Sequence, residues 1–154
     1  MSGGDGRPPW SGEEFRKGSE LLLDMVSRHP EAGPRLAALE MAARVVFPDL
    51  SLELVVRPAD AARRRKGHHL AWSWGRKKGS PPPVTATLGS VVAARCAQGK
   101  QPIPLALARE EITLAGLDDR NRRDALLDTV PVLVRLQKVY VRTLKEAGLT
   151  VLLV

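Results

Sequence analysis

The sequence has little of what membrane-spanning, secreted or disulfide-stabilised proteins contain. No apolar run approaches the roughly 20 residues of a membrane-spanning helix, and MSGGDGRPPW at the N-terminus lacks the apolar core of a signal peptide. The one cysteine, Cys96, cannot form an internal disulfide, so we expect a cytoplasmic protein. No histidine or cluster of basic residues adjoins Cys96, which favours a small structural thiol over a nucleophile.

Residues of catalytic or metal-binding type are also scarce. The chain has three histidines: His29, His68 and His69. None of them has a carboxylate or a cysteine at the spacing of metal ligands. The paired acids Glu110-Glu111 and Asp118-Asp119 fall at the two ends of one expected strand, where turn residues and helix caps are common. The sequence therefore predicts no enzyme, no catalytic residues, no metal site and no cofactor.

Basic residues outnumber acidic ones, and the net charge of +7 implies attraction to polyanions such as nucleic acid or an acidic membrane surface. Seven basic residues fall in two expected strand connections: Arg63, Arg64, Arg65 and Lys66 in the first, and Arg76, Lys77 and Lys78 in the second. Such runs are usually solvated loops, and contact with phosphate head groups is the alternative. Nucleic-acid binding is disfavoured because Trp72 and Trp74 fall on the apolar face of a strand, where they cannot stack on bases.

The N-terminal part of the chain predicts a tail followed by helices. Residues 1–10 are rich in Gly and Pro and predict a disordered tail, and residues 11–154 predict a single domain. Ser11 and Glu14 have the spacing of a capping box and open a helix from Gly12 to about Arg28. A second helix, from Glu31 to about Phe47, completes a helical part that we place at residues 11–48.

From Leu50 onwards the apolar period changes from that of a helix to two, which predicts strands. Four stretches alternate in this way: Ser51–Arg57, His69–Gly75, Pro83–Leu88 and Glu111–Leu117. One apolar and one polar face in each strand indicate a largely antiparallel sheet that helices cover on one side. Before the last of these strands, Ser90 is a candidate N-cap for a helix that ends at Gly99-Lys100.

The final segment, Asp119 to Gly148, predicts a helix with more apolar surface than one contact can cover. At about 100° per residue its apolar side chains span roughly twice the arc that an ordinary surface helix buries. Such a helix must touch the sheet and also more protein, a twin subunit or an apolar ligand. Pro131 predicts a kink or a short break, with Thr129 available to cap the second part.

The order of these elements resembles the sterol carrier protein 2 (SCP2-like) family over roughly Leu50 to Gly148, and the helix before it also fits many bacterial members. The resemblance is carried by VTATLGSVVAARCAQGK, which ends at Gly99-Lys100, and by the strand ITLAG followed by the leucine-rich helix around Pro131. It implies an α+β fold: residues 50–148 form a largely antiparallel sheet of about five strands with helices covering one face. It also implies an apolar tunnel between the layers for a sterol, fatty acyl chain or other lipid. Glu110-Glu111 depart from the Gly-Lys that often precedes this strand in the family, which changes the expected entry turn.

These patterns predict a non-enzymatic protein that binds or transfers a lipid or other apolar small molecule and touches anionic membranes transiently through its basic loops. A homodimer seam, or an accessory role in a larger enzyme system, is the alternative use of the extra apolar surface. Eight residues are the candidates for lining the tunnel, and core packing is the alternative for each: Trp72, Trp74, Ile112, Leu114, Leu126, Val130, Leu133 and Tyr140.

Overall fold

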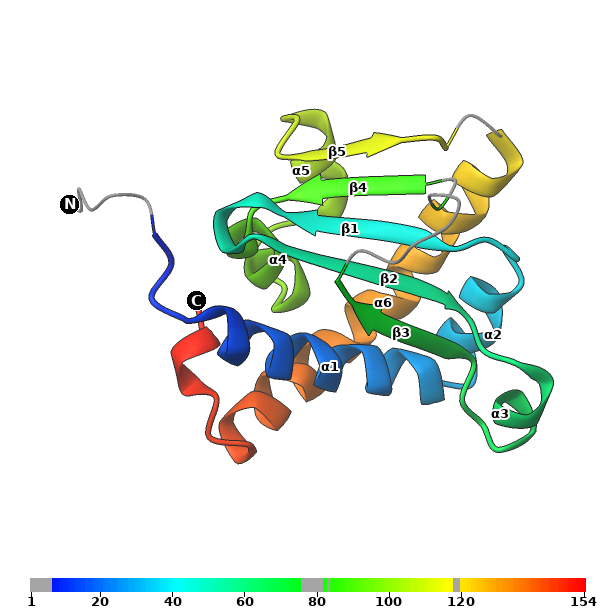
Figure 1. The fold of residues 1–154 in the computed structure, drawn as a ribbon, viewed down its shortest axis with the longest axis horizontal. Helices are drawn as coiled ribbons and strands as arrows, with labels where there is room; N and C mark the ends of the chain where they lie inside the picture. The colour runs from blue at the N-terminus through cyan, green and yellow to red at the C-terminus, as the bar shows by residue number, and fades with distance from the viewer. Residues whose placement is uncertain (1–6, 76–81, 83, 118–119) are drawn as a thin grey trace.

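A five-stranded sheet forms one layer of the structure. The computed structural model describes residues 7–75, 82, 84–117 and 120–154. The strands are β1 Ala43–Phe47, β2 Leu52–Pro58, β3 Leu70–Trp74, β4 Val84–Leu88 and β5 Ile112–Ala115. They lie in the order β3-β2-β1-β4-β5, with β1 parallel to β4 and every other pair antiparallel (Figure 1). The predicted α+β fold with a largely antiparallel sheet is confirmed.

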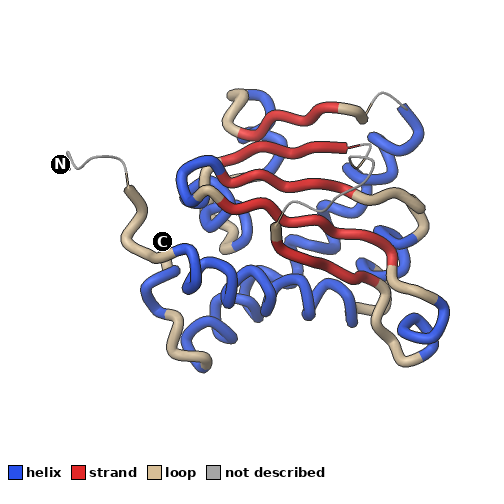
Figure 2. Tube along the Cα trace, in the orientation of Figure 1, coloured by secondary structure: helices blue, strands red, loops and turns tan. Residues whose placement is uncertain are grey.

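Helices form the second layer. They are α1 Gly12–Arg28, α2 Ala32–Ala37, α3 Ala61–Arg65, α4 Ser90–Ala97, α5 Ile103–Ala108 and α6 Arg120–Glu146, with short 3-10 turns at Pro48–Leu50 and Thr150–Leu152. The sheet faces the viewer in Figure 1 and α6 crosses behind it, while Figure 2 shows the strands grouped beside the helices. Within the described residues, no helix has the length and apolar character to cross a membrane.

The pairing register brings the alternate apolar residues of all five strands to one face. Leu54 lies opposite both Val45 and Trp74, and Ala86 lies opposite both Val45 and Leu114. Several of these inward residues pack against helical side chains in the main core cluster, including Phe47 and Leu54, which are buried. The face predicted from the period of two is therefore the one that meets the helices.

The first helix begins and ends where the sequence predicts. The Ser11 hydroxyl accepts a hydrogen bond from the Glu14 amide at 3.1 Å, and Glu14 Oε1 accepts one from the Ser11 amide at 2.9 Å. These two bonds satisfy donors that the first turn of a helix otherwise leaves unpaired. Phe15 and Val26 are buried on the inner side of α1, and His29 is its C-cap.

Packing of the chain begins before residue 11. Trp10 is only 4% exposed, stacks near Phe15 and donates a hydrogen bond from Nε1 to Ser90 Oγ at 2.9 Å. Burial of the indole and the hydrogen bond of its N–H stabilise this segment by more than the conformational entropy that its ordering costs. The prediction that the tail extends through residue 10 is therefore wrong at Trp10, and residues 1–6 lie outside the described residues.

The helix α4 takes its cap from a distant residue. Gly89 is its N-cap and gives no side-chain bond, while Asp49 accepts hydrogen bonds from the Ser90 amide at 2.9 Å and from Ser90 Oγ at 2.6 Å. The prediction that Ser90 is the N-cap is wrong by one residue. The Asp49 carboxylate satisfies this amide, and its negative charge lies at the positive end of the helix dipole.

The predicted second helix, Glu31 to about Phe47, is wrong in its second half. α2 ends at Ala37, Glu40 has a positive φ of 51°, and Ala43–Phe47 is strand β1 between β2 and β4. The β-branched Val45 and Val46 favour a strand, and pairing on both sides completes the backbone hydrogen bonds. The helical part predicted at residues 11–48 therefore also contains the central strand of the sheet.

The long final helix runs through its proline without the predicted break. α6 is continuous from Arg120 to Glu146, and Thr129 Oγ1 donates to the Ala125 carbonyl at 2.9 Å, so Thr129 caps no second segment. Pro131 has no N–H to donate to the carbonyl four residues before it. It is on the exposed side of the helix, where water can bond to that carbonyl instead. The next residue, Val132, is fully buried and packs α6 against its neighbours.

Candidate functional site

A first apolar cavity, the inner pocket, lies between the sheet and the helices. Its volume is about 350 Å³. It is lined by Leu22, Leu23, Val26, Leu36, Val45, Phe47, Val56, Leu70, Leu88, Ala93, Cys96, Ala97, Ile103, Ile112, Leu133, Leu136 and Gln137. These residues come from three strands on the β3 side, from β4 and β5, and from helices α1, α2, α4, α5 and α6. Every wall is therefore apolar except at Gln137 and the thiol of Cys96.

A second cavity, the edge pocket, lies between β5, α5 and the N-terminal half of α6. Its volume is about 510 Å³. It is lined by Ile103, Leu107, Ile112, Leu114, Ala115, Gly116, Leu117, Arg123, Leu126, Leu127, Val130 and Leu133. Leu114 is 39% exposed and Leu127 is 41% exposed, so large apolar side chains at this pocket also meet solvent. Apolar walls at the opening of a pocket favour an apolar ligand over water.

The two pockets adjoin each other. Ile103, Ile112 and Leu133 line both of them. Leu133 is the shared residue on α6, and it also packs against the smaller core cluster that contains Val132. The size of the side chain at position 133 therefore determines how much open space lies between the core of the protein and the exposed edge of the sheet.

The opening at the edge follows from where α6 is fastened. The helix packs most closely against α1 and α2, at the other side of the sheet from β5. The Tyr140 hydroxyl donates to the Gly18 carbonyl at 3.0 Å, and Val132 and Leu144 are fully buried. The N-terminal half of α6 has no comparable packing against β5, whose burial is also slight. The edge pocket occupies that space.

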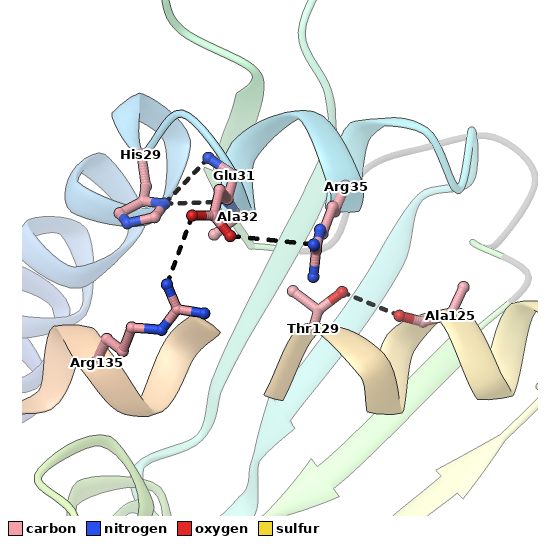
Figure 3. A network of polar contacts seen from close by, with 7 residues as sticks. All are labelled: His29, Glu31, Ala32, Arg35, Ala125, Thr129 and Arg135. Atoms are coloured by element: carbon pink, nitrogen blue, oxygen red, sulfur yellow. Dashed lines mark hydrogen bonds and ion pairs between the residues drawn. The ribbon is translucent and has the colours of Figure 1, made fainter. Parts of the chain in front are cut away.

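Polar contacts also join α2 to α6, as Figure 3 shows. Arg135 Nη1 lies 3.5 Å from Glu31 Oε1, and Arg35 Nη2 lies 3.9 Å from Glu31 Oε2. His29 Nδ1 accepts hydrogen bonds from the amides of Glu31 and Ala32, each at 3.1 Å. Exposed ion pairs each contribute about 0–1 kcal/mol, so these contacts add little to the packing of α2 against α6.

The few polar groups in the walls are already bonded within the chain. Arg123 Nη2 donates to the Leu117 carbonyl at 2.9 Å, and Gln137 Nε2 donates to the Cys96 carbonyl at 3.1 Å. No described group of three His, Cys, Asp or Glu side chains could hold a metal ion. The described walls thus offer shape and apolar surface, with little polar recognition.

Burial makes the thiol of Cys96 a weak acid. Desolvation raises its pKa, and the nearby negative charge of Glu111 raises it further. The thiolate is the reactive form, and it becomes abundant only as the pH rises through this raised pKa. The structure therefore agrees with a structural thiol in the wall of the inner pocket.

Cys96 provides a probe of that pocket. We expect an aromatic disulfide reagent at mildly alkaline pH to modify Cys96 at least about tenfold more slowly in the folded protein than in denaturant, because the raised pKa and burial both limit the thiolate. An apolar ligand in the inner pocket should slow the reaction further. Release of the reagent's chromophore gives the rate, and fast folded-state labelling would contradict the burial of this wall.

The structure brings five of the eight predicted lining residues to the pockets. Ile112 and Leu133 line both pockets, and Leu114, Leu126 and Val130 line the edge pocket. Tyr140 belongs to the main core cluster, Trp72 and Trp74 pack against that cluster, and none of the three lines either pocket.

The two tryptophans lie under α1. Trp72 Nε1 donates to Glu20 Oε2 at 3.3 Å, and the Arg16 guanidinium lies 5.3 Å from the Trp74 ring centroid. Tyr140 is buried, and desolvation raises its pKa to about 12. These three side chains therefore serve the packing between α1 and its neighbours.

Several wall residues were not among the predicted lining residues, because the prediction took its residues from the strands and the final helix alone. They are Leu22, Leu23 and Val26 of α1, Leu36 of α2, and Ile103 and Leu107 of α5. The amphipathic pattern of α1 was the available signal, but a pattern does not distinguish a cavity wall from a packed core. The α5 stretch is too short for such a pattern.

The predicted anionic-surface residues are only partly described. Arg63, Arg64 and Arg65 lie on α3 and Lys66 follows it, and all four are exposed in the connection between β2 and β3. This connection is at the sheet edge opposite β5 and the edge pocket. Arg76, Lys77 and Lys78 lie outside the described residues.

Comparison with known proteins identifies the fold. No protein-family model and no curated protein matches the chain. A solution structure of sterol carrier protein domain 2 of Helicoverpa armigera is similar with a TM-score of 0.55 and 15% identity, over 86% of this chain and 95% of that one. The ubiquinone synthesis protein UbiJ-SCP2 is similar with a TM-score of 0.51 and 15% identity, over 77% of this chain and 94% of that one.

A much larger enzyme contains a similar unit. The stereoselective inverting sec-alkylsulfatase of a Pseudomonas species matches with a TM-score of 0.51 and 18% identity over 73% of this chain, and the match spans 16% of the enzyme's length. The chain therefore has the SCP2-like fold, which makes up nearly all of the first two solved chains and a small part of the enzyme.

Proposed function

We propose that this protein binds a hydrophobic ligand, such as a sterol, a fatty acyl chain or another lipid, in a channel formed by the inner and edge pockets, and that it catalyses no reaction itself. The observation that carries the proposal is the pair of apolar pockets that share Leu133, Ile103 and Ile112. A chain-like ligand would enter past Leu114 and Leu127 and extend inward beside Leu133. The SCP2-like fold of the similar structures supports this reading.

Burial of the ligand supplies the free energy of binding. About 300 Å² of apolar ligand surface removed from water would contribute roughly 7 kcal/mol before the cost of association. The walls offer few unpaired polar groups, so selectivity would depend on the length and thickness of the ligand. Ile112, Leu114, Leu126, Val130 and Leu133 are the residues we propose as ligand contacts.

Ligand extraction tests the proposal. We expect organic solvent to release about one equivalent of an apolar molecule from natively purified protein, with mass spectrometry to identify it. Protein refolded after this extraction should take up a fluorescent fatty acid, and unlabelled lipid should displace the probe. A protein that yields no apolar molecule and binds no probe would contradict the proposal.

An accessory role in a larger enzyme system is the second candidate. The alkylsulfatase, in which the similar unit spans 16% of the chain, favours it. In that role the exposed Leu114 and Leu127 would be covered by another protein or by a second copy of this chain. Light scattering over a range of concentrations tests the second copy, and a constant monomer mass would contradict a homodimer.

A further inference from the structure

One side of α6 links the edge pocket to a basic groove at the C-terminal end of the helix. The residues of this side are Arg123, Leu127, Val134, Lys138, Val141 and Lys145, and we call them the α6 stripe. They follow one another at the three-, four- and seven-residue spacings that place side chains on one side of a helix. Arg123 and Leu127 line the edge pocket, and Lys138, Val141 and Lys145 line the basic groove.

The basic groove brings three lysine side chains together. Its volume is about 390 Å³, and it is lined by Gln98, Lys100, Lys138, Val141, Lys145, Leu153 and Val154. The side chain of Gln98 is already used, because it donates to the Leu152 carbonyl at 2.6 Å and accepts from the Val154 amide at 3.1 Å. The three lysine side chains are exposed and make no ion pair within the described part of the chain.

The same side of the helix also exposes apolar groups. Val134 is 49% exposed midway between the edge pocket and the groove, and Leu127 is exposed at the pocket itself. Asp124 is the acidic residue beside the stripe, and it lies 3.9 Å from Arg120, which offsets its charge. Lysines alternating with exposed aliphatic residues fit a surface that is anionic outside and apolar beneath.

We propose that the α6 stripe, together with Lys100, docks on an anionic lipid bilayer with the edge pocket opening toward the membrane. Lys100, Lys138 and Lys145 contact lipid phosphates, while Leu127 and Val134 enter the interfacial region. Nucleic acid fits this surface less well because the stripe holds no aromatic side chain on which a base could stack. The basic helix α3 lies at the opposite sheet edge and serves as the natural control surface.

Vesicle binding tests the location of the surface. Wild-type protein is expected to bind vesicles of phosphatidylcholine with phosphatidylglycerol, to bind pure phosphatidylcholine vesicles weakly, and to lose binding as salt is added. Lys138→Ala combined with Lys145→Ala should lower the partition coefficient about 25-fold, since each surface lysine contributes about fivefold. Arg63→Ala combined with Arg65→Ala removes the same charge from α3 and should change it by less than about twofold.

The outcomes separate this proposal from its competitors. Equal losses for the two double variants, or equal binding of neutral and anionic vesicles by the wild type, would overturn it. Tighter binding of an oligonucleotide through Lys138 and Lys145 would overturn it in favour of nucleic acid. The Leu133→Trp variant separates membrane docking from ligand binding. Its indole fills the channel, and its binding to vesicles should stay unchanged. This result is expected whether or not a lipid occupies the channel in the wild type.

Discussion

Leu133→Trp is expected to lower the affinity for an apolar ligand by at least about tenfold, which corresponds to about 1.4 kcal/mol of binding free energy. Leu133 lines both the inner and the edge pocket, so an indole at this position would occupy the space between them. Because the added volume enters an existing cavity, the free energy of unfolding should change by less than the 1–3 kcal/mol or so that overpacking of a filled core costs. Titration with a fluorescent fatty acid and denaturant unfolding measure the two quantities.

Val139→Trp is the matched control for this substitution. Val139 lies on the same helix, is 45% exposed and lines neither pocket. The control should bind the probe as the wild type does, because its indole projects away from the channel. Wild-type affinity in Leu133→Trp would refute the channel as the binding site, and equal losses in both variants would indicate damage to α6 instead.

The strands on either side of the centre could be predicted from sequence because each has one buried face. Leu52, Leu54 and Val56 share the face of β2 that meets the helices, and this period of two survives in the observed register, although Val55 on the other face is also buried. The same alternation located β3, β4 and β5. One-sided burial is a local property of each strand, so a single sequence can reveal it.

The central strand β1 could not be found in this way. Leu36, Leu39, Ala43 and Val46 have helical spacing, but Ala43 and Val46 belong to a strand that pairs with β2 and β4. Five residues are too few to separate the two periods, and the parallel partner β4 lies about 40 residues further along the chain. The capping of α4 by Asp49 likewise depends on a contact between residues that are about as far apart in the sequence.

The candidate site was predicted in part for a related reason. The alternation of β3 placed Trp72 and Trp74 on the inward face correctly, but it could not show that α1 covers this half of the face. The residues at the β5 edge, such as Ile112 and Leu114, have no such cover and line the edge pocket. The sequence of a strand predicts which side chains share its apolar face. Which part of that face borders a cavity depends on where the helices lie.

The division of α6 into two halves explains its surplus of apolar surface. Leu126, Val130 and Leu133 line pockets in the first half, whereas Tyr140 and Leu144 are packed into the core with α1 in the second. The pattern of the helix alone predicted two contacts around its circumference. In the structure, part of the extra apolar surface is explained by different contacts along the length of the helix, with pockets beside the first half and the core beside the second.

Leu144→Ala is therefore expected to destabilise the fold by about 3 kcal/mol, within the range of roughly 2–5 kcal/mol for such truncations in a core. Leu144 is fully buried, and its neighbourhood is closely packed: a Cβ built on Gly18 would meet Leu152 Cδ1 at 2.3 Å and Leu144 Cδ2 at 3.5 Å. The truncation would leave a void that these neighbours can fill only in part. Denaturant unfolding monitored by circular dichroism gives the change in free energy.

Leu127→Ala is the control for this truncation, because Leu127 is an exposed leucine of the same helix and should cost at most about 1 kcal/mol. The folded fraction of Leu144→Ala should bind the probe with wild-type affinity, since Leu144 lines neither pocket. A small loss of stability in Leu144→Ala would contradict the close packing of this part of α6 against α1.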